Sequence, residues 1–368
     1  MHFDFSEDQR RLQDELRRML GAISTPAEVR RVLEGTACHS AASWRALADI
    51  GALGLALPEA LGGAGMGRLE LCLLAEEAGR ALAAVPLLGT TYLAAELLLH
   101  AASPALQAQY LPRIAAGTAI LTAAIDQHGQ HAGPTPAPLL AAHTLTAQLD
   151  AVADGMLAEA IIVLAGDALV LVDLAGPGVQ RCPRASLDPT RPLAQIACTA
   201  APAQVLCPAG GRAIAARISD GAAVLLAFEQ VGGAEKALYA ARDHALERRA
   251  FGRVIGGFQA VRHKLADIYI AVELARAHAY YGAWALATNA PELPRAAAAA
   301  RVAATDAYTL AAEESLHLHG GIGFTWEMDC HLHLRRARWL GQILGTRHYW
   351  EERLAAALIA EAGQEEAA

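Results

Sequence analysis

Hydrophobic residues in the first third of the chain recur at the spacing of an α-helix. Leu12, Leu16 and Leu20 are separated by charged residues, as on one face of an amphipathic helix. A second periodic segment over residues 69–82 follows a glycine-rich connector, which also favours a helix. We therefore expect a helical domain over residues 1–120.

The pattern changes in the middle of the chain. Pro and Gly become frequent, and short β-type runs appear at 160–164 and 169–172, so we expect a small β domain over residues 121–220. Long Ala, Leu, Arg and Glu segments over residues 221–368 predict a four-helix bundle. The expected fold class is α+β, with a helical domain, a β domain and a helical bundle in that order.

Composition narrows the class of protein. The 368 residues are 54% hydrophobic, which excludes a disordered chain. The 30 basic and 38 acidic side chains give a net charge of −8, which argues against a nucleic-acid partner. Because no uncharged apolar run is long enough to cross a bilayer, and no signal peptide opens the chain, we expect a cytoplasmic protein without a membrane partner.

A glycine-rich segment after a helical pattern is the first candidate site. His317 and His319 precede Gly320, Gly321 and Gly323, and glycine permits a close approach to a flat or phosphorylated ligand. A simple glycine helix cap is the alternative. The nearby histidines and Cys330 form no recognised zinc signature, so we expect no metal site.

An arginine-rich motif is the second candidate. Arg248 could bind a phosphate, Phe251 could cover a ring and Gln259 could hydrogen-bond a polar edge. Solvated helix arginines around a helix-breaking Gly252 are the alternative. For the similar cluster at 335–338, the charge pattern favours a solvated face.

An acidic residue interrupts an apolar run in the third region. Glu229 follows Phe228 and precedes Gln230 in a segment that is otherwise hydrophobic. The carboxylate is either a buried base or an exposed helix residue, and helical periodicity allows both.

Together these motifs, in this order, resemble the acyl-CoA dehydrogenase family along nearly the whole chain. In that family a glutamate removes the α-proton of an acyl-CoA thioester while the β-hydrogen leaves as hydride to FAD, which lies at a subunit interface. Electron-transfer flavoprotein is the electron acceptor that the resemblance implies. The motifs that carry the resemblance are Trp44, Leu57-Pro58-Glu59, Gly62-Gly63, Glu76 to Arg80, Arg248 to Gln259, and His319 to Trp326.

The resemblance implies a set of FAD-binding residues. The family's Arg-x-x-Phe-Gly and Gln, its Gly-Gly, and the Gly-Thr after the usual catalytic glutamate are all present, and a histidine stands where many members have Gln. These residues reach a neighbouring subunit's FAD in the family, apart from the Gly-Thr. The expected cofactor-binding residues are Arg248, Phe251, Gln259, His317, Gly320, Gly321 and Thr346.

The family's catalytic base has no counterpart, so the catalytic residue of this chain is unknown. Leu344 occupies the position of the common glutamate, and Ala222 lies near the alternative one. Glu229 is seven residues further on, about 10.5 Å along a helix. The segment 124–131 also lacks the family's flavin-contacting pattern, and no Trp-x-Thr or Trp-x-Ser occurs in the region.

The chain thus keeps the residues that reach a neighbour's FAD but lacks the catalytic base and the flavin-contacting pattern. In this it resembles the paired family members that form α2β2 heterotetramers with fewer flavins than subunits, some of which act on steroid side chains. We expect a partner subunit that completes the FAD site of a second acyl-CoA dehydrogenase chain. One rival is a self-sufficient enzyme, a homodimer or homotetramer, with Glu229 as its base. A non-enzymatic scaffold with the same fold is the other.

Overall fold

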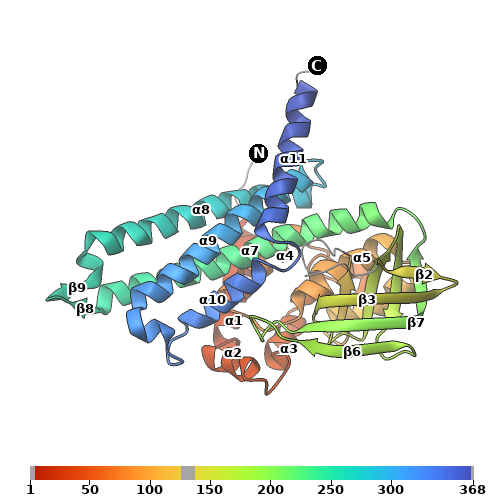
Figure 1. Ribbon diagram of the computed structural model, residues 1–368, viewed down its shortest axis with the longest axis horizontal. Helices are drawn as coiled ribbons and strands as arrows, with labels where there is room; N and C mark the ends of the chain where they lie inside the picture. Colours follow the sequence, from red (N-terminus) through yellow and green to blue (C-terminus); the bar gives the residue numbers. More distant parts are fainter. Residues whose placement is uncertain (1–4, 126–136, 366–368) are drawn as a thin grey trace.

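A computed structural model describes residues 5–125 and 137–365. It confirms the expected α+β architecture, with helices at both ends of the chain and a sheet between them (Figure 1). In the part of the chain that it describes, no helix is long and apolar enough to cross a membrane.

The N-terminal domain consists of short helices. Its first helix starts with a capping box, in which the Ser6 hydroxyl accepts from the Gln9 amide and the Gln9 side chain accepts from the Ser6 amide. Leu16 and Leu20 of this helix are buried, as the helical spacing predicts. The helices are α1 (Glu7–Ile23), α2 (Pro26–Leu33), α3 (Ala41–Asp49), α4 (Arg68–Arg80), a π-helix η3 (Leu88–Ala94), α5 (Ala95–Ala101) and α6 (Pro104–Ala115), with 3₁₀ turns η1 (Ala52–Gly54) and η2 (Glu59–Leu61).

The β domain is a seven-stranded sheet in the order β1-β4-β5-β7-β3-β2, with β6 also paired to β7. Strands β4 and β5, which form an antiparallel hairpin, coincide with the two predicted β-type runs. Among the strands of the described residues, β1 and β4 are the one pair that runs parallel. The strands are β1 (Leu121–Ala124), β2 (Leu139–Ala141), β3 (Thr144–Ala153), β4 (Ala160–Ala165), β5 (Ala168–Asp173), β6 (Val179–Arg184) and β7 (Leu193–Cys207).

The C-terminal domain is built on a 37-residue helix, α7. Gly210, in the left-handed conformation, precedes it, so α7 begins ahead of the expected boundary at 220. We propose Gly210 as the boundary of the β domain. The elements are α7 (Gly211–Glu247), a hairpin of β8 (Arg249–Ala250) and β9 (Arg253–Val254), η4 (Ile255–Gly257), α8 (Gln259–Ala287), α9 (Leu293–His319), η5 (Gly320–Phe324), α10 (Cys330–Leu340) and α11 (Arg347–Glu365).

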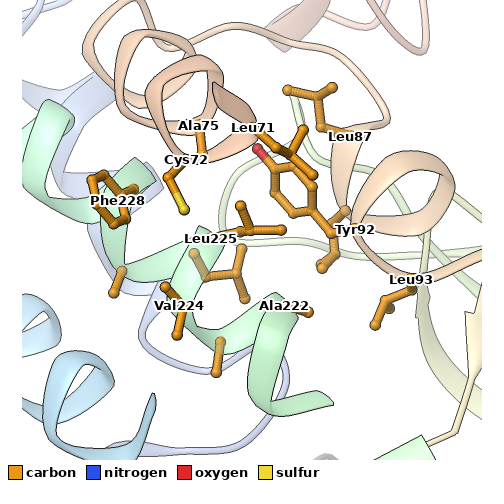
Figure 2. Packing of buried hydrophobic residues seen from close by; sticks show 14 of the residues in the cluster. Leu71, Cys72, Ala75, Leu87, Tyr92, Leu93, Ala222, Val224, Leu225 and Phe228 are labelled. Atoms are coloured by element: carbon orange, nitrogen blue, oxygen red, sulfur yellow. The ribbon is translucent and has the colours of Figure 1, made fainter. Parts of the chain in front are cut away.

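Helices α4 and α7 pack backbone against backbone. A Cβ at Gly79 would lie 1.9 Å from the Glu229 carbonyl oxygen, and one at Gly232 would lie 1.9 Å from that of Glu76. Next to this contact, apolar side chains from α4 and η3 meet those of α7 (Figure 2). The core therefore joins the two helical domains into one unit.

Candidate functional site

The arginine motif forms a hairpin at one end of the bundle (Figure 1). α7 ends at Glu247, and Phe251 and Gly252 make the turn between β8 and β9 with φ of 50° and 80°. Positive φ is unfavourable for a phenylalanine, so this turn holds the residue in an uncommon backbone conformation. The helix thus ends before Arg248, so these arginines do not lie on a helix, but their exposure agrees with the alternative of solvated arginines around a helix-breaking Gly252.

The side chains at this hairpin project from the protein. Phe251 is 95% exposed, and its ring and that of Phe258 lie perpendicular at a centroid distance of 6.3 Å. Arg248 and Gln259 are exposed too, and among the described residues the Arg248 guanidinium has no ion-pair partner. An exposed aromatic ring and an unpaired cation this near in the chain are groups that could bind a ligand or a second chain.

The glycine segment lies at the same end of the bundle. The His319 imidazole donates from Nδ1 to the Ser315 carbonyl at 2.7 Å, and its ring stacks on that of His244 in α7 at 4.2 Å. This contact ties the end of α9 to the end of α7. His317 is exposed, with Nδ1 3.9 Å from a Glu314 oxygen.

The two expected FAD-binding glycines follow His319 directly. Gly320 ends α9 with φ of 65°, which favours glycine. A Cβ at Gly321 would meet nothing within 4 Å in the described structure, so the chain's own packing does not require glycine there. The backbone at Gly321 is therefore open to a group from outside the chain.

Thr346 does not join the other six expected cofactor-binding residues. It caps the N-terminus of α11, where its Oγ1 accepts from the Tyr349 amide at 3.3 Å. η5 and Thr346 lie at opposite ends of α10, whose 11 residues span about 16 Å. Six of the seven residues thus lie at the bundle end, and Thr346 lies beyond the other end of α10.

The two positions where the family places a base are occupied by apolar, buried residues. Leu344 is buried with φ of 58°, and its carbonyl accepts from Trp350 Nε1 at 3.1 Å. Ala222 lies on the wall of a cavity of about 20 Å³, which is room for about one water molecule. Neither residue has a side chain that can accept a proton.

Glu229 is fully buried and ion-paired. Its Oε2 lies 2.5 Å from Nη2 of Arg191, which comes from the loop between β6 and β7. Burial, and then the charge of Glu229, raise the pKa of Tyr92 well above its usual value. The exposed alternative for Glu229 is therefore wrong, and its carboxylate is engaged by a guanidinium.

A second buried ion pair lies in the same loop, and the sequence interpretation missed it. Arg336 Nε donates to Asp188 Oδ2 at 2.5 Å, so the expectation of a solvated face is wrong at this position. Arg336 also donates to the Leu82 carbonyl at 3.2 Å, and Arg191 donates to that of Val85 at 3.1 Å. The Asp188-to-Arg191 loop thereby joins all three domains.

Between the β domain and α10 lies a crevice of about 210 Å³. Pockets for drug-sized ligands measure about 300–1,000 Å³, and FAD is larger than such ligands. The residues that line the crevice carry no charge, so they do not fit the pyrophosphate of FAD. They are Ala151, Ala185, Ser186, Leu187, Leu193, Trp339, Gln342 and Ile343.

Two further expectations concern groups in this part of the protein. The segment 126–131, which departs from the family's flavin-contacting pattern, lies outside the described residues, so the structure shows only Ala124 and Ile125 of that stretch. Over residues 5–125 and 137–365, no three His, Cys, Asp or Glu side chains are placed to hold a metal ion.

Comparisons with known proteins cover most of the chain. The N-terminal domain model of acyl-CoA dehydrogenase matches residues 6–118, and the C-terminal domain model matches residues 209–359. Acyl-CoA dehydrogenase IpdE2 of Mycobacterium tuberculosis is 37% identical over 339 residues, which are 92% of this chain and 93% of that protein.

Two solved structures extend the comparison to the fold. A chain of the ChsE4-ChsE5 complex from Mycobacterium tuberculosis is 29% identical with a TM-score of 0.90, covering 98% of this chain and 99% of that one. A chain of a Tcur3481-Tcur3483 steroid ACAD variant is 31% identical with a TM-score of 0.88, covering 97% and 99%.

Proposed function

We propose that this chain, which belongs to the acyl-CoA dehydrogenase family, is the partner subunit that completes the FAD site of a second, catalytic chain. The family is a family of FAD-dependent oxidoreductases, and the proposed complex would oxidise an acyl-CoA thioester between its α and β carbons. Electron-transfer flavoprotein is the proposed electron acceptor.

One observation carries this proposal: the groups for a neighbour's cofactor are exposed, whereas the positions for the chain's own catalytic base hold buried apolar residues. Arg248, Phe251 and Gln259 project from the bundle end. Leu344 and Ala222 are buried and apolar. A self-sufficient enzyme needs both halves of the site, so the difference between them favours a shared site.

Each exposed residue has a distinct role in the proposal. FAD, when bound at the interface, supplies a ring that accepts a hydride. The Arg248 guanidinium would bind its pyrophosphate, because a rigid fork of donors matches phosphate oxygens. Phe251 would cover the adenosine, and Gln259 and His317 would hydrogen-bond its polar edges. Gly320 and Gly321 would let the backbone approach the cofactor closely.

The relatives support a heteromeric assembly. Two of the structural neighbours, ChsE4-ChsE5 and Tcur3481-Tcur3483, each combine two named chains, and one of them is described as a steroid ACAD. We infer that this chain assembles in the same manner, on a bulky or steroid-like CoA thioester.

The rival in which Glu229 acts as the base needs the carboxylate to leave Arg191. Their 2.5 Å contact lies in a fully buried position, and breaking it would leave two uncompensated charges. A scaffold that binds no cofactor would give no reason for an unpaired Arg248 beside an exposed Phe251. Neither rival accounts for the arrangement as well as the partner subunit does.

Arg248→Ala tests the proposal in a complex made by co-expression with an acyl-CoA dehydrogenase chain encoded nearby. We expect at least a tenfold weaker retention of FAD, because a charge-assisted hydrogen bond to phosphate is lost. Arg249→Ala is the matched control, since Arg249 is an adjacent and equally exposed arginine. Equal FAD retention in the two variants would contradict the proposal.

A further inference from the structure

A further cavity lies between the N-terminal helices and the end of the bundle. It measures about 670 Å³, within the range of about 300–1,000 Å³ that pockets for small ligands occupy. Its walls come from α1, α2 and the end of α4 on one side, and from α7, the end of α9 and the start of α10 on the other. None of the seven expected cofactor-binding residues lines it. The cavity is therefore a separate candidate site.

Part of the cavity wall is apolar. Val29, Leu82 and Leu332 pack together as a small cluster apart from the main core, and all three line the cavity. They come from α2, from the residues that follow α4, and from α10. On the α7 side, Tyr239 also lines the cavity and is 37% exposed. These groups suit the hydrocarbon part of a ligand, because apolar surface is stabilised when it leaves water.

One face of α7 lines the cavity. Lys236, Tyr239, Ala240 and Asp243 lie on it, because residues three, four and seven positions apart share a helix face. Asp243 is ion-paired with Arg242 at 2.7 Å. Lys236 is exposed and, among the described residues, has no ion-pair partner. Lys236 therefore brings an uncompensated positive charge to this wall.

Two arginines on the facing wall are already bound to a carboxylate. Arg17 donates to Glu77 from Nε at 3.1 Å and from Nη2 at 2.8 Å, and Arg80 Nε donates to Glu77 at 2.9 Å. Among the described residues that line the cavity, Glu327 is the carboxylate without an ion-pair partner. A ligand of this cavity therefore meets one free cation, Lys236, and one free anion, Glu327.

The buried side of the cavity carries a neutral histidine. His333 lines it at 7% exposure, and its Nδ1 lies 3.0 Å from the Tyr308 hydroxyl. Burial, and then the positive charges of Lys236 and Arg336, lower the pKa of His333 to about 3. The imidazole is therefore neutral at physiological pH, and the charge of Lys236 reaches it. A positive potential on this side of the cavity favours an anionic group over a cationic one.

We propose that this cavity binds a small carboxylic acid with a hydrocarbon body. The carboxylate would pair with the Lys236 ammonium, and the body would lie against Val29, Leu82 and Leu332. An ammonium is a compact point charge, which suits a single carboxylate, whereas phosphate is better matched by a guanidinium fork. The inference stands apart from the proposed function, because it needs neither FAD nor a second chain.

Isothermal titration calorimetry of the full chain tests the proposal, with octanoate as the probe and octanol as its neutral match. Octanoate should bind with a dissociation constant below about 1 mM, and octanol at least about tenfold more weakly, because octanol lacks the charge that pairs with Lys236. No binding of octanoate, or equal binding of octanol, would overturn the proposal.

Two charge substitutions test the sign of the ligand's charge. Lys236→Gln should weaken octanoate binding at least about fivefold, and Glu327→Gln should strengthen it, because a like charge is then removed. Lys264→Gln is the matched control, since Lys264 is the other lysine of the chain and is ion-paired with Glu314. Circular dichroism of each variant confirms folding. Equal affinities in the lysine variants, or effects of the opposite sign, would contradict an anionic ligand.

A substitution that fills the cavity tests the location. Ala240 is partly buried in the α7 wall, so Ala240→Trp would place an indole in the space that the ligand needs. This variant should lower the affinity for octanoate at least about tenfold. Ala105→Trp is the control, because Ala105 is exposed on α6 and does not line the cavity. Unchanged affinity in a folded Ala240→Trp protein would show that octanoate binds elsewhere and would overturn the assignment.

Discussion

The carboxylate of Glu229 and the guanidinium of Arg191 form an ion pair of 2.5 Å from which solvent is excluded. The pair connects α7 to the loop of the β domain. Breaking a buried pair leaves one charge without compensation, which costs about 3–5 kcal/mol, whereas replacing both partners by apolar residues is often neutral. The pair therefore holds α7 against the β6–β7 loop, which is a structural role.

Arg191→Met should accordingly lower the free energy of unfolding by about 3–5 kcal/mol. The double variant with Glu229→Leu should recover most of that loss. Denaturant unfolding measures both. Arg184→Ala is the control, because its pair with Asp150 is partly exposed and should contribute less than about 1 kcal/mol. A double variant as unstable as the single one would contradict the structural role.

A pH effect is expected at Asp154, which accepts from the Gly89 amide at 3.2 Å. Burial raises the pKa of Asp154 from 3.8 to about 6, and the nearby Arg191 and the Gly89 amide limit the rise. The folded protein then holds this proton more tightly than the unfolded chain. The Asp154 carboxyl therefore contributes most to the free energy of unfolding below about pH 4, and this contribution is lost as pH rises through 6.

Asp154→Asn removes the titration and should keep the hydrogen bond. Compared with the wild type at each pH, its free energy of unfolding should be higher at pH 7.5 than at pH 4 by about 2 kcal/mol, from the size of the shift. Denaturant unfolding at the two pH values gives the comparison. If the variant and the wild type differed in free energy of unfolding by the same amount at both pH values, the pKa of Asp154 would be ordinary and the prediction would be wrong.

Because α4 and α7 are in close contact, a glycine-to-alanine substitution there should lower the stability of the protein, although helix propensity alone predicts a gain. Alanine is favoured over glycine in a helix by about 1 kcal/mol. At Gly232, however, a Cβ would lie 1.9 Å from the Glu76 carbonyl oxygen. Gly232→Ala should therefore destabilise the protein by more than about 2 kcal/mol, since the two helices must move apart.

The matched control is Gly21→Ala in α1, where a Cβ meets nothing within 4 Å. That variant should be stabilised by up to about 1 kcal/mol. Thermal melts of both variants check the pair of predictions. A Gly232→Ala protein as stable as the wild type would mean that the helices are less closely packed than described.

Local sequence patterns predicted the helices and strands, but they did not predict ion pairs between residues far apart in the sequence. The spacing of Leu16 and Leu20 fixes a buried helix face, and the β-branched run at 160–164 fixes a strand, because both depend on neighbours in the chain. Arg336 looked solvated because its partner Asp188 lies 148 residues away. Spacing carries no information on such a pair.

The candidate site divides in the same way. Arg248, Phe251 and Gln259 lie close in sequence, so their gathering at the bundle end follows from the motif. The hairpin that exposes Phe251 could not be predicted from the motif, because it depends on a positive φ at a residue other than glycine. Arg191 as the partner of Glu229 could have been suspected only from the charged Asp188-Pro189-Thr190-Arg191 loop.

The flavin content of the protein purified alone, measured with its native mass, tests the central claim most directly. Absorbance of the flavin released on denaturation gives the ratio of FAD to chain. A partner subunit should retain little or no FAD alone and gain it on co-expression with a catalytic chain. A ratio near one FAD per chain, with turnover of an acyl-CoA thioester, would contradict the account and make Glu229 the candidate base.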